Sequence, residues 1–509
     1  MTGALRLFLP VVLLASLAGV STTAVPSASS ARTPAPKAAS GHAGGASASS
    51  ARTPAPKAAS GHAGAASAGS AATKSGSDRA GTPTPRAGRA TAASTGGASP
   101  TAASTGGATP TAPVSRPTTG PPTAQLAKLR ATLGTEMHHA GKSSGAYVVD
   151  LTTGQVLYSL HPTTPRIPAS VEKLYTTSTV LARFGPATQL QTSVLGVGSA
   201  DDKGVWTGNL YVHGGGDPTF GTDSPPGSQA TPTILASALL AATGITRVDG
   251  AVIGDETLFD QRRGDPSSGY LPDSELDGEL SGLADDHGSL GGLSSPAVFA
   301  ASQVAKALRA SGVAVTGRTG VGPTPKGARL LAGVKSPNLA TIIALTDQPS
   351  DNFYAETLLK DLGAYYGSGG SSAAGAAVVR AWLAQLGIRP HLVDGSGLSP
   401  TDRTTPEQIV TLLADLKPNA AGPLAPIGAA LMAALPVAGR SGTLADRMQK
   451  TPAAGRCQAK TGTLTGVSNL AGVCDGRYAF AFLMNQIGDT KAHTLQDDMT
   501  EAIAALTPG

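Results

Sequence analysis

The chain has 509 residues, of which 65 are glycine and 38 are proline, and its formal net charge is +5 at pH 7. This charge is unevenly spread: residues 25–124 contain nine Lys or Arg and one Asp, so residues 125–509 carry a net charge of −4. Because the basic balance belongs to one segment, it gives no reason to expect a basic nucleic-acid groove, and we predict no nucleic-acid partner.

The first 24 residues have the features of an export signal. Arg6 gives a weakly positive start, and residues 7–20 form an apolar stretch that is short for crossing a bilayer. Thr22 and Ala24 are small residues that offer a cleavage site. The sequence therefore predicts a signal peptide over residues 1–24 and an exported protein, either secreted or held in the extracytoplasmic cell envelope. An uncleaved membrane anchor is the alternative interpretation.

Residues 25–124 consist of Ala, Ser, Thr, Gly and Pro with almost no large apolar side chains. A 15-residue unit that begins at Ser30 is repeated from Ser50. Such a segment cannot bury enough apolar surface to offset the entropy lost on ordering, so we predict a disordered basic tether. Its charge suits contact with anionic wall polymers or a membrane surface, and a spacer with incidental charge is the alternative.

The remaining residues, 125–509, are long enough for one large or two modest domains. We predict an α+β fold in which residues 125–188 and 326–509 form one domain and residues 189–325 form an inserted, mostly β accessory region. The predicted helices cover residues 125–133, 170–183, 232–242, 298–310, 338–346, 352–362, 373–386 and 495–506, with one more that begins at Pro406 and is capped by Thr405. The predicted strands cover residues 145–151, 155–160, 191–197, 205–212, 247–253, 457–461, 468–474 and 478–485.

Three short motifs follow one another in this part of the chain. They are Ser170-Val171-Glu172-Lys173, Ser350-Asp351-Asn352 and Lys460-Thr461-Gly462-Thr463, and the first is the only Ser-x-x-Lys in the sequence. Each motif alone carries a high risk of a false match. The ordered set is typical of the active site of a penicillin-recognising serine acyltransferase.

The first motif supplies a nucleophile and its base. A serine hydroxyl is a poor nucleophile at neutral pH unless a base takes its proton, and Ser170 and Lys173 lie one helical turn apart on the same face. Lys173 acts as a base only if its pKa falls, which burial and the nearby cation of Lys460 would cause. Ser350 is suited to relay a proton to the leaving amine. The backbone N–H groups of Ser170 and Thr463 are the expected oxyanion hole.

The other residue types in the motifs are suited to binding a peptide. The amide of Asn352 can bind a substrate amide and also orient the catalytic lysine. Lys460 and the hydroxyls of Thr461 and Thr463 can hold a terminal carboxylate, while Gly462 lets the substrate approach the backbone of the strand.

Residues 145–509 resemble the D-alanyl-D-alanine carboxypeptidase/endopeptidase family, the class C low-molecular-mass penicillin-binding proteins of peptidase family S13 type. Besides the three motifs, the resemblance rests on Gly208-Asn209-Leu210-Tyr211, Gly214-Gly215-Gly216-Asp217-Pro218, Asp394-Gly395-Ser396-Gly397-Leu398-Ser399, Leu435-Pro436-Val437-Ala438-Gly439 and Leu464-Thr465-Gly466-Val467-Ser468. The chain departs from the family in two ways. The 180-residue interval between Ser170 and Ser350 is short, and Ser441 and Asp402 stand where members usually carry Asp and Asn.

The resemblance implies a transpeptidase/β-lactamase-like domain, with an antiparallel sheet and flanking helices, interrupted by an insertion. It implies a serine-type carboxypeptidase that cleaves terminal D-Ala from peptidoglycan stem peptides, with endopeptidase activity as a variant. The reaction would pass through an acyl-enzyme on Ser170, β-lactams would inhibit it, and no cofactor would be needed.

Two smaller features have competing interpretations. Cys457 and Cys474 are the only cysteines, and in an exported protein an isolated pair is most simply one disulfide; two buried free thiols are the alternative. Asp285-Asp286-His287 has the residue types of a metal site but no further ligands at metal spacing, so we interpret it as a structural loop and predict no metal site.

Two other functions fit parts of the sequence. A β-lactamase shares the three motifs, but its motifs lie closer together and the long insertion argues against it. A non-catalytic wall-binding protein with a vestigial site is the second alternative, and the complete set of catalytic residue types argues against it.

Overall fold

The computed structural model describes residues 119–417 and 422–507. The predicted signal peptide and nearly all of the predicted tether lie outside these residues. The tether was predicted to end at residue 124, whereas helix α1 (Thr123–Ala140) already begins at residue 123. Within the described residues, no helix has both the length and the apolar character needed to span a membrane.

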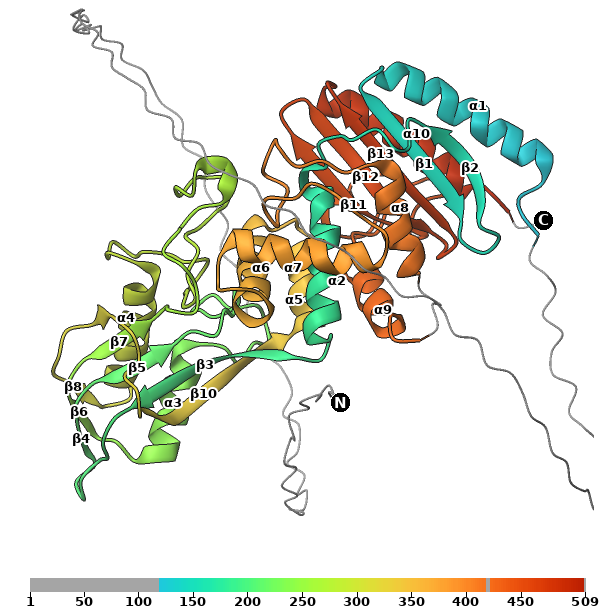
Figure 1. Cartoon of the computed structure of the whole chain (residues 1–509). Coiled ribbons are helices and arrows are strands. Elements are labelled where there is room, and N and C mark those ends of the chain that lie inside the picture. Colours follow the sequence, from blue (N-terminus) through green and yellow to red (C-terminus); the bar gives the residue numbers. More distant parts are fainter. Residues whose placement is uncertain (1–118, 418–421, 508–509) are drawn as a thin grey trace, which may run out of the picture. The chain divides into compact units, whose positions relative to one another are not determined.

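The first sheet is antiparallel and joins both ends of the described chain (Figure 1). Its strands, in spatial order, are β11 (Cys457–Leu464), β12 (Val467–Cys474), β13 (Tyr478–Asn485), β1 (Ser144–Asp150) and β2 (Gln155–Leu160). Strand β12 is buried along its whole length, which means that both faces of the sheet centre are covered. The sheet therefore holds β11, which carries the third motif, in a fixed register.

Alternation along the strands decides which side chains meet which helices. Phe480 and Phe482 of β13 pack with α1 and the last helix, α10 (Asp489–Ala504), on one face. Ala479 and Ala481 point to the opposite face and pack with α8 (Pro406–Asp415) and the other helices. Small residues on this second face allow the close approach of α8.

A helical layer packs on that second face. It contains α2 (Lys173–Phe184), α5 (Leu339–Asp347), α6 (Asn352–Tyr366), α7 (Ser372–Gln385) and α9 (Ala425–Ala434), which share one hydrophobic core with α8. Thr405 caps α8 as predicted, since its hydroxyl accepts the backbone N–H of Gln408 at 3.2 Å. Helix α9 was missed by the sequence analysis.

A separate hydrophobic core belongs to the segment between α2 and α5. This segment contains a mixed sheet and a parallel sheet. The strands of the mixed sheet, in spatial order, are β10 (Arg329–Asn338), β3 (Gln189–Gly196), β5 (Leu210–His213), β7 (Val252–Asp255) and β9 (Gly320–Val321). The strands of the parallel sheet are β4 (Val205–Thr207), β6 (Arg247–Asp249) and β8 (Ala314–Val315). Helices α3 (Pro232–Thr243) and α4 (Pro296–Ala310) pack against these strands.

Two predicted strands are each divided in the structure. The predicted strands 205–212 and 247–253 break at Gly208 and Gly250, and in both cases the first half joins one sheet and the second half joins the other. A Cβ on Gly250 would collide with the backbone of Gly208, which has a φ of +116°. Two glycines in contact thus let the chain cross between sheets twice.

The segment that carries these two sheets starts and ends at neighbouring points. Leu339 donates its backbone N–H to Thr188 at 2.8 Å, and Ala340 donates to Pro186 at 3.0 Å. Strand β10 pairs with β3, so the mixed sheet continues beyond residue 325, where the sequence analysis ended the accessory region. The prediction of an α+β fold is confirmed.

Candidate active site

The segment that carries Ser170 is held tightly against the first sheet. It forms a single 3₁₀ turn (Ala169–Glu172) before α2 begins, so the predicted helix from residue 170 starts with a tighter turn. Asn469 of β12 donates to the carbonyls of Ile167 and Pro168 at 3.0 and 2.7 Å. Ala169 has a φ of +47°, a conformation that L-residues rarely adopt and that is often found at functional sites.

Lys173 is fully buried one turn after Ser170 and has three polar contacts. Its Nζ lies 3.0 Å from Ser170 Oγ, 2.6 Å from Asn352 Oδ1 and 2.8 Å from the backbone oxygen of Ser396. Two of these partners are carbonyl oxygens, which can only accept. In a neutral amine they therefore take both hydrogens, and the lone pair is left for the hydroxyl proton of Ser170.

The environment of Lys173 also favours the neutral amine. Burial lowers its pKa from 10.5 to about 8, although the carboxylates of Asp347 and Asp351 act in the opposite direction. A lysine with this pKa has an appreciable fraction of free base near neutral pH, as a general base requires.

The second motif forms the turn between α5 and α6. Ser350 has a φ of +68°, and Asp351 caps α6 by accepting the backbone N–H of Tyr354. Asn352 is the first residue of α6, where its Oδ1 accepts from Lys173 and its Nδ2 donates to the backbone oxygen of Glu275 at 2.7 Å. One N–H of this amide remains for a ligand.

The third motif brings a second buried lysine to the same place. Lys460 Nζ donates to Ser350 Oγ at 2.8 Å and to the backbone oxygen of its neighbour Thr461 at 3.1 Å. Burial and the charge of Lys173 lower the pKa of Lys460, while the buried carboxylate of Asp347 opposes this shift. Sequence reasoning missed Asp347; nothing but its position three residues before Ser350 could have marked it.

Strand β11 runs past the nucleophile segment at Gly462. Thr461 Oγ1 lies 2.9 Å from Thr443 Oγ1, and the Thr463 side chain is exposed. A Cβ on Gly462 would lie 2.7 Å from the backbone oxygen of Pro168 and 2.9 Å from the backbone nitrogen of Val171. Glycine is therefore needed at this position because the strand runs directly past the turn that carries the serine.

All eight predicted catalytic and binding residues are thus on elements that meet. The hydrogen bonds join Ser170, Lys173 and Asn352 in one group and Ser350 and Lys460 in another. Cys457 and Cys474 face each other across β11 and β12 and form a disulfide. This crosslink fixes the start of the strand three residues before Lys460.

A loop that sequence reasoning left without a role completes the surroundings of Lys173. Residues 394–399 supply the Ser396 carbonyl to the lysine, and Gly395 accepts a hydrogen bond from Thr176 Oγ1 at 3.0 Å. Gly397 has a φ of +83°, and a Cβ there would collide with the backbone oxygen of Ala169. The loop therefore packs directly against the nucleophile segment.

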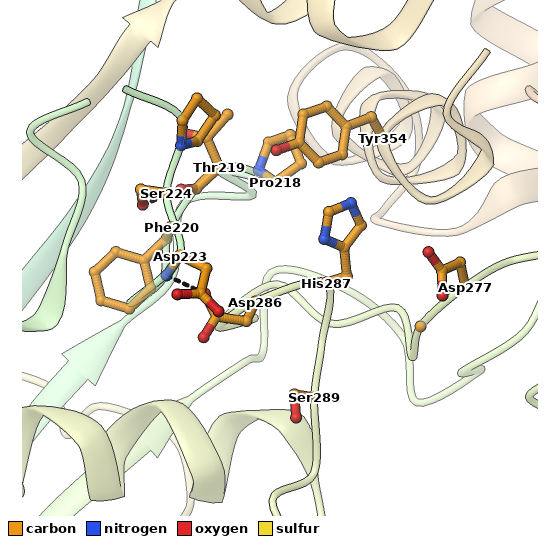
Figure 2. Close-up of a pocket in the computed structure, with 12 residues that line it drawn as sticks. Pro218, Thr219, Phe220, Asp223, Ser224, Asp277, Asp286, His287, Ser289 and Tyr354 are labelled. Atoms are coloured by element: carbon orange, nitrogen blue, oxygen red, sulfur yellow. Dashed lines mark hydrogen bonds between the residues drawn. The ribbon is translucent and has the colours of Figure 1, made fainter. Parts of the chain in front are cut away.

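A cavity of about 510 Å³ lies beside the second motif, lined in part by Tyr354, Asp277 and His287 (Figure 2). His287 Nε2 lies 3.1 Å from Asp351 Oδ2, and this contact raises the pKa of the histidine. Asp286 Oδ1 accepts the backbone N–H of Asp223 at 2.8 Å. The Asp285-Asp286-His287 segment is thus a loop held by hydrogen bonds to its neighbours. Among the described residues, a different set has carboxyl oxygens close enough together to suit a metal ion, namely Glu172, Asp394 and Asp402.

The model of the D-Ala-D-Ala carboxypeptidase 3 (S13) family matches residues 125–274 and 273–506. The chain belongs to this family. It is 29% identical over 456 residues to a D-alanyl-D-alanine carboxypeptidase of Actinomadura sp. (strain R39), covering 72% of this chain and 81% of that protein. It is also 29% identical over 371 residues to carboxypeptidase DacB of Mycolicibacterium smegmatis, covering 67% of this chain and 76% of the relative.

The fold of this chain is similar to that of a solved penicillin-binding protein. The crystal structure of penicillin-binding protein 4 (dacB) from Haemophilus influenzae matches with a TM-score of 0.61 at 21% identity, covering 72% of this chain and 97% of that one. The same protein in complex with a β-lactam matches with a TM-score of 0.57. The predicted family is therefore confirmed, and the α+β architecture is that of a penicillin-binding protein.

Proposed function

We propose that the protein is a serine-type D-Ala-D-Ala carboxypeptidase that hydrolyses the terminal D-Ala from peptidoglycan stem peptides through an acyl-enzyme on Ser170. The single observation that supports this most strongly is the arrangement of Lys173, whose two carbonyl partners leave its lone pair for the serine 3.0 Å away. Membership of the S13 family supports the choice of substrate.

The proposed acylation step follows from the contacts in the site. Lys173 takes the proton of Ser170 while Oγ attacks the carbonyl carbon of the penultimate D-Ala. The tetrahedral oxyanion is held by the backbone N–H groups of Ser170 and Thr463. Ser350 passes its proton to the leaving amine of the terminal D-Ala and is reprotonated with the proton that Lys173 took from Ser170, so that Lys173 is neutral again. Lys460, which donates to Ser350 Oγ at 2.8 Å, makes that hydroxyl more acidic. The C–N bond breaks, and free D-Ala leaves.

Deacylation uses the same base with water as the nucleophile. Lys173 takes a proton from water, the hydroxide attacks the ester, and Ser170 Oγ recovers the proton as the stem peptide leaves. During acylation Lys460 and the hydroxyls of Thr461 and Thr463 hold the terminal carboxylate, which leaves with D-Ala, and Asn352 binds the substrate amide through its free N–H.

The same chemistry explains the other proposals for this chain. A β-lactam ring presents a strained amide next to a carboxylate, so it acylates Ser170 and inhibits the enzyme. Cleavage of cross-links, the endopeptidase variant, needs only a larger leaving amine. Peptidoglycan lies outside the cytoplasmic membrane, so we infer an extracytoplasmic location. Contacts of the basic residues 25–124 with wall polymers or lipid remain a prediction.

The direct test is release of D-Ala from an acylated tripeptide that ends in D-Ala-D-Ala, compared with the same peptide ending in D-Ala-L-Ala. The full chain should release the C-terminal residue from the first peptide only, and Ser170→Ala should release it from neither. Rapid hydrolysis of a β-lactam with no action on the peptide would instead show a β-lactamase. A folded protein inert toward both would be a non-catalytic binding protein.

A further inference from the structure

A cluster of buried carboxyl groups lies directly behind the catalytic lysine. Glu172 precedes Lys173 and is 0% exposed. Glu172, Asp394 and Asp402 each place a carboxyl oxygen within 4.8 Å of the others, and Glu356 of α6 is also close enough to act on them electrostatically. Like charges at this spacing cannot all be ionised without a compensating proton or cation.

The four carboxyl groups accept different numbers of hydrogen bonds from their surroundings. Asp394 accepts the backbone N–H groups of Gly397 and Ser399 at 2.9 and 2.6 Å, and Asp402 Oδ1 accepts that of Val393 at 2.8 Å. Glu356 Oε1 accepts two backbone N–H groups at 2.7 Å, from residues 395 and 396. No donor reaches either oxygen of Glu172, and Asp402 Oδ2 is also without one. Backbone donors stabilise the ionised form of the three acceptors, whereas nothing stabilises ionised Glu172.

We propose that Glu172 carries a proton and donates it to Asp402, and that this hydrogen bond makes Glu172 a positioning residue for the catalytic lysine. The hydrogen bond itself does not depend on the proposed function; only its effect on catalysis rests on that function. A carboxylic O–H on Glu172 would give a hydrogen-bond partner both to one oxygen of Glu172 and to Asp402 Oδ2, and it needs no further group.

The bond matters because it ties the nucleophile segment to the loop that positions Lys173. Asp402 and Asp394 belong to the chain that presents the Ser396 carbonyl to Lys173 Nζ at 2.8 Å. Ionisation of Glu172 would place two carboxylates in contact and push this loop away. It would also add a negative charge beside the lysine, which favours the ammonium form that cannot act as a base.

Burial raises the pKa of all four carboxyl groups, and backbone N–H groups act in the opposite direction on Asp394, Asp402 and Glu356 but not on Glu172. Burial, and then the carboxylates of Asp402 and Asp394, raise the pKa of Glu172 well above its ordinary value. On the nucleophile helix, the titratable groups near it are Lys173, whose pKa burial lowers, and Tyr175, whose pKa burial raises. A carboxyl with a raised pKa stabilises the fold fully at pH values below its ordinary pKa. That contribution is lost as the pH rises toward the raised pKa, about tenfold in the unfolding constant per pH unit.

The test compares Glu172→Gln, which keeps a donor, with Glu172→Leu, which removes it, in the full chain. Glu136→Gln, at a partly exposed position of α1, is the matched control. We expect a carboxylic-acid C=O stretching band in wild type and Glu136→Gln at neutral pH, with reduced intensity in Glu172→Gln. Between the pKa of Glu172 in the unfolded chain and its raised pKa in the folded one, the unfolding constant of wild type should rise about tenfold more per pH unit than that of Glu172→Gln.

Kinetics add a readout that a purely structural role would not give. Glu172→Gln should keep its penicillin acylation rate within about threefold of wild type at pH 7, because one donated hydrogen bond replaces another, whereas Glu172→Leu should lose roughly tenfold or more. Equal damage from both substitutions, with the infrared band unchanged in Glu172→Gln, would overturn the proposal. So would a Ca²⁺, Mg²⁺ or Mn²⁺ ion that wild type retains on dialysis and Glu172→Gln does not. The infrared and unfolding measurements do not depend on activity, so they distinguish this failure from failure of the proposed function.

Discussion

Replacing Lys460 by alanine should reveal what its buried charge does. The side chain is 0% exposed and donates to Ser350 Oγ at 2.8 Å, so a substrate carboxylate beside it would form a desolvated ion pair. Removing one partner of such a pair costs about 2–5 kcal/mol, which corresponds to a loss of about 30- to 4,000-fold in kcat/KM. A substrate whose terminal carboxylate is a neutral methyl ester should lose only the contribution of the hydrogen bond to Ser350, about 1 kcal/mol or about fivefold.

The assay measures kcat/KM for a D-Ala-D-Ala peptide and for its methyl ester, with wild type, Lys460→Ala and the surface control Lys450→Ala. The charge of Lys460 also disfavours the ammonium form of Lys173, so the variant should need a higher pH to reach its plateau with both substrates. The comparison is therefore made on each plateau. Equal losses for the acid and the ester would refute carboxylate binding by Lys460.

Three further results are expected. The penicillin acylation rate should rise about tenfold per pH unit and level off near pH 8, because Lys173 has a pKa of about 8 and must be neutral; a flat profile from about pH 6 would contradict its role as the base. Gly397→Ala should lower acylation by tenfold or more because its Cβ has no space, while Gly154→Ala, also at positive φ but in open surroundings, should cost only about 1–2 kcal/mol of stability and leave acylation unchanged. Removing the crosslink with Cys457→Ala and Cys474→Ala should lower the free energy of unfolding by about 3 kcal/mol, the value for a 17-residue separation; an unchanged urea midpoint would show that the disulfide contributes nothing.

The sequence predicted the elements that carry the chemistry because each motif lies at a strong local signal. The helix after Ser170, the turn at Ser350 and the strand with Lys460 all have periodicity or turn residues that local reasoning can use. The structure adds the contacts between them. Asn469 could not be recognised from sequence, since its two hydrogen bonds to residues 167 and 168 span some three hundred positions.

The errors of the sequence analysis also have physical causes. The strands around Gly208 and Gly250 looked continuous because a glycine within an apolar run does not show that the chain changes sheet. Strand β10 alternates only weakly, and most of its pairing partners lie near residue 190, far away in sequence. The role of the loop around Ser396 was missed because it acts through a backbone carbonyl, which any residue type provides.

The most direct test of the account is covalent labelling of the full chain with a fluorescent penicillin, beside Ser170→Ala. The account predicts one stable label per wild-type molecule, attached to Ser170 by peptide mapping, and no label on the variant. A label on another residue, or equal labelling of Ser170→Ala, would contradict the assignment of Ser170 as the nucleophile.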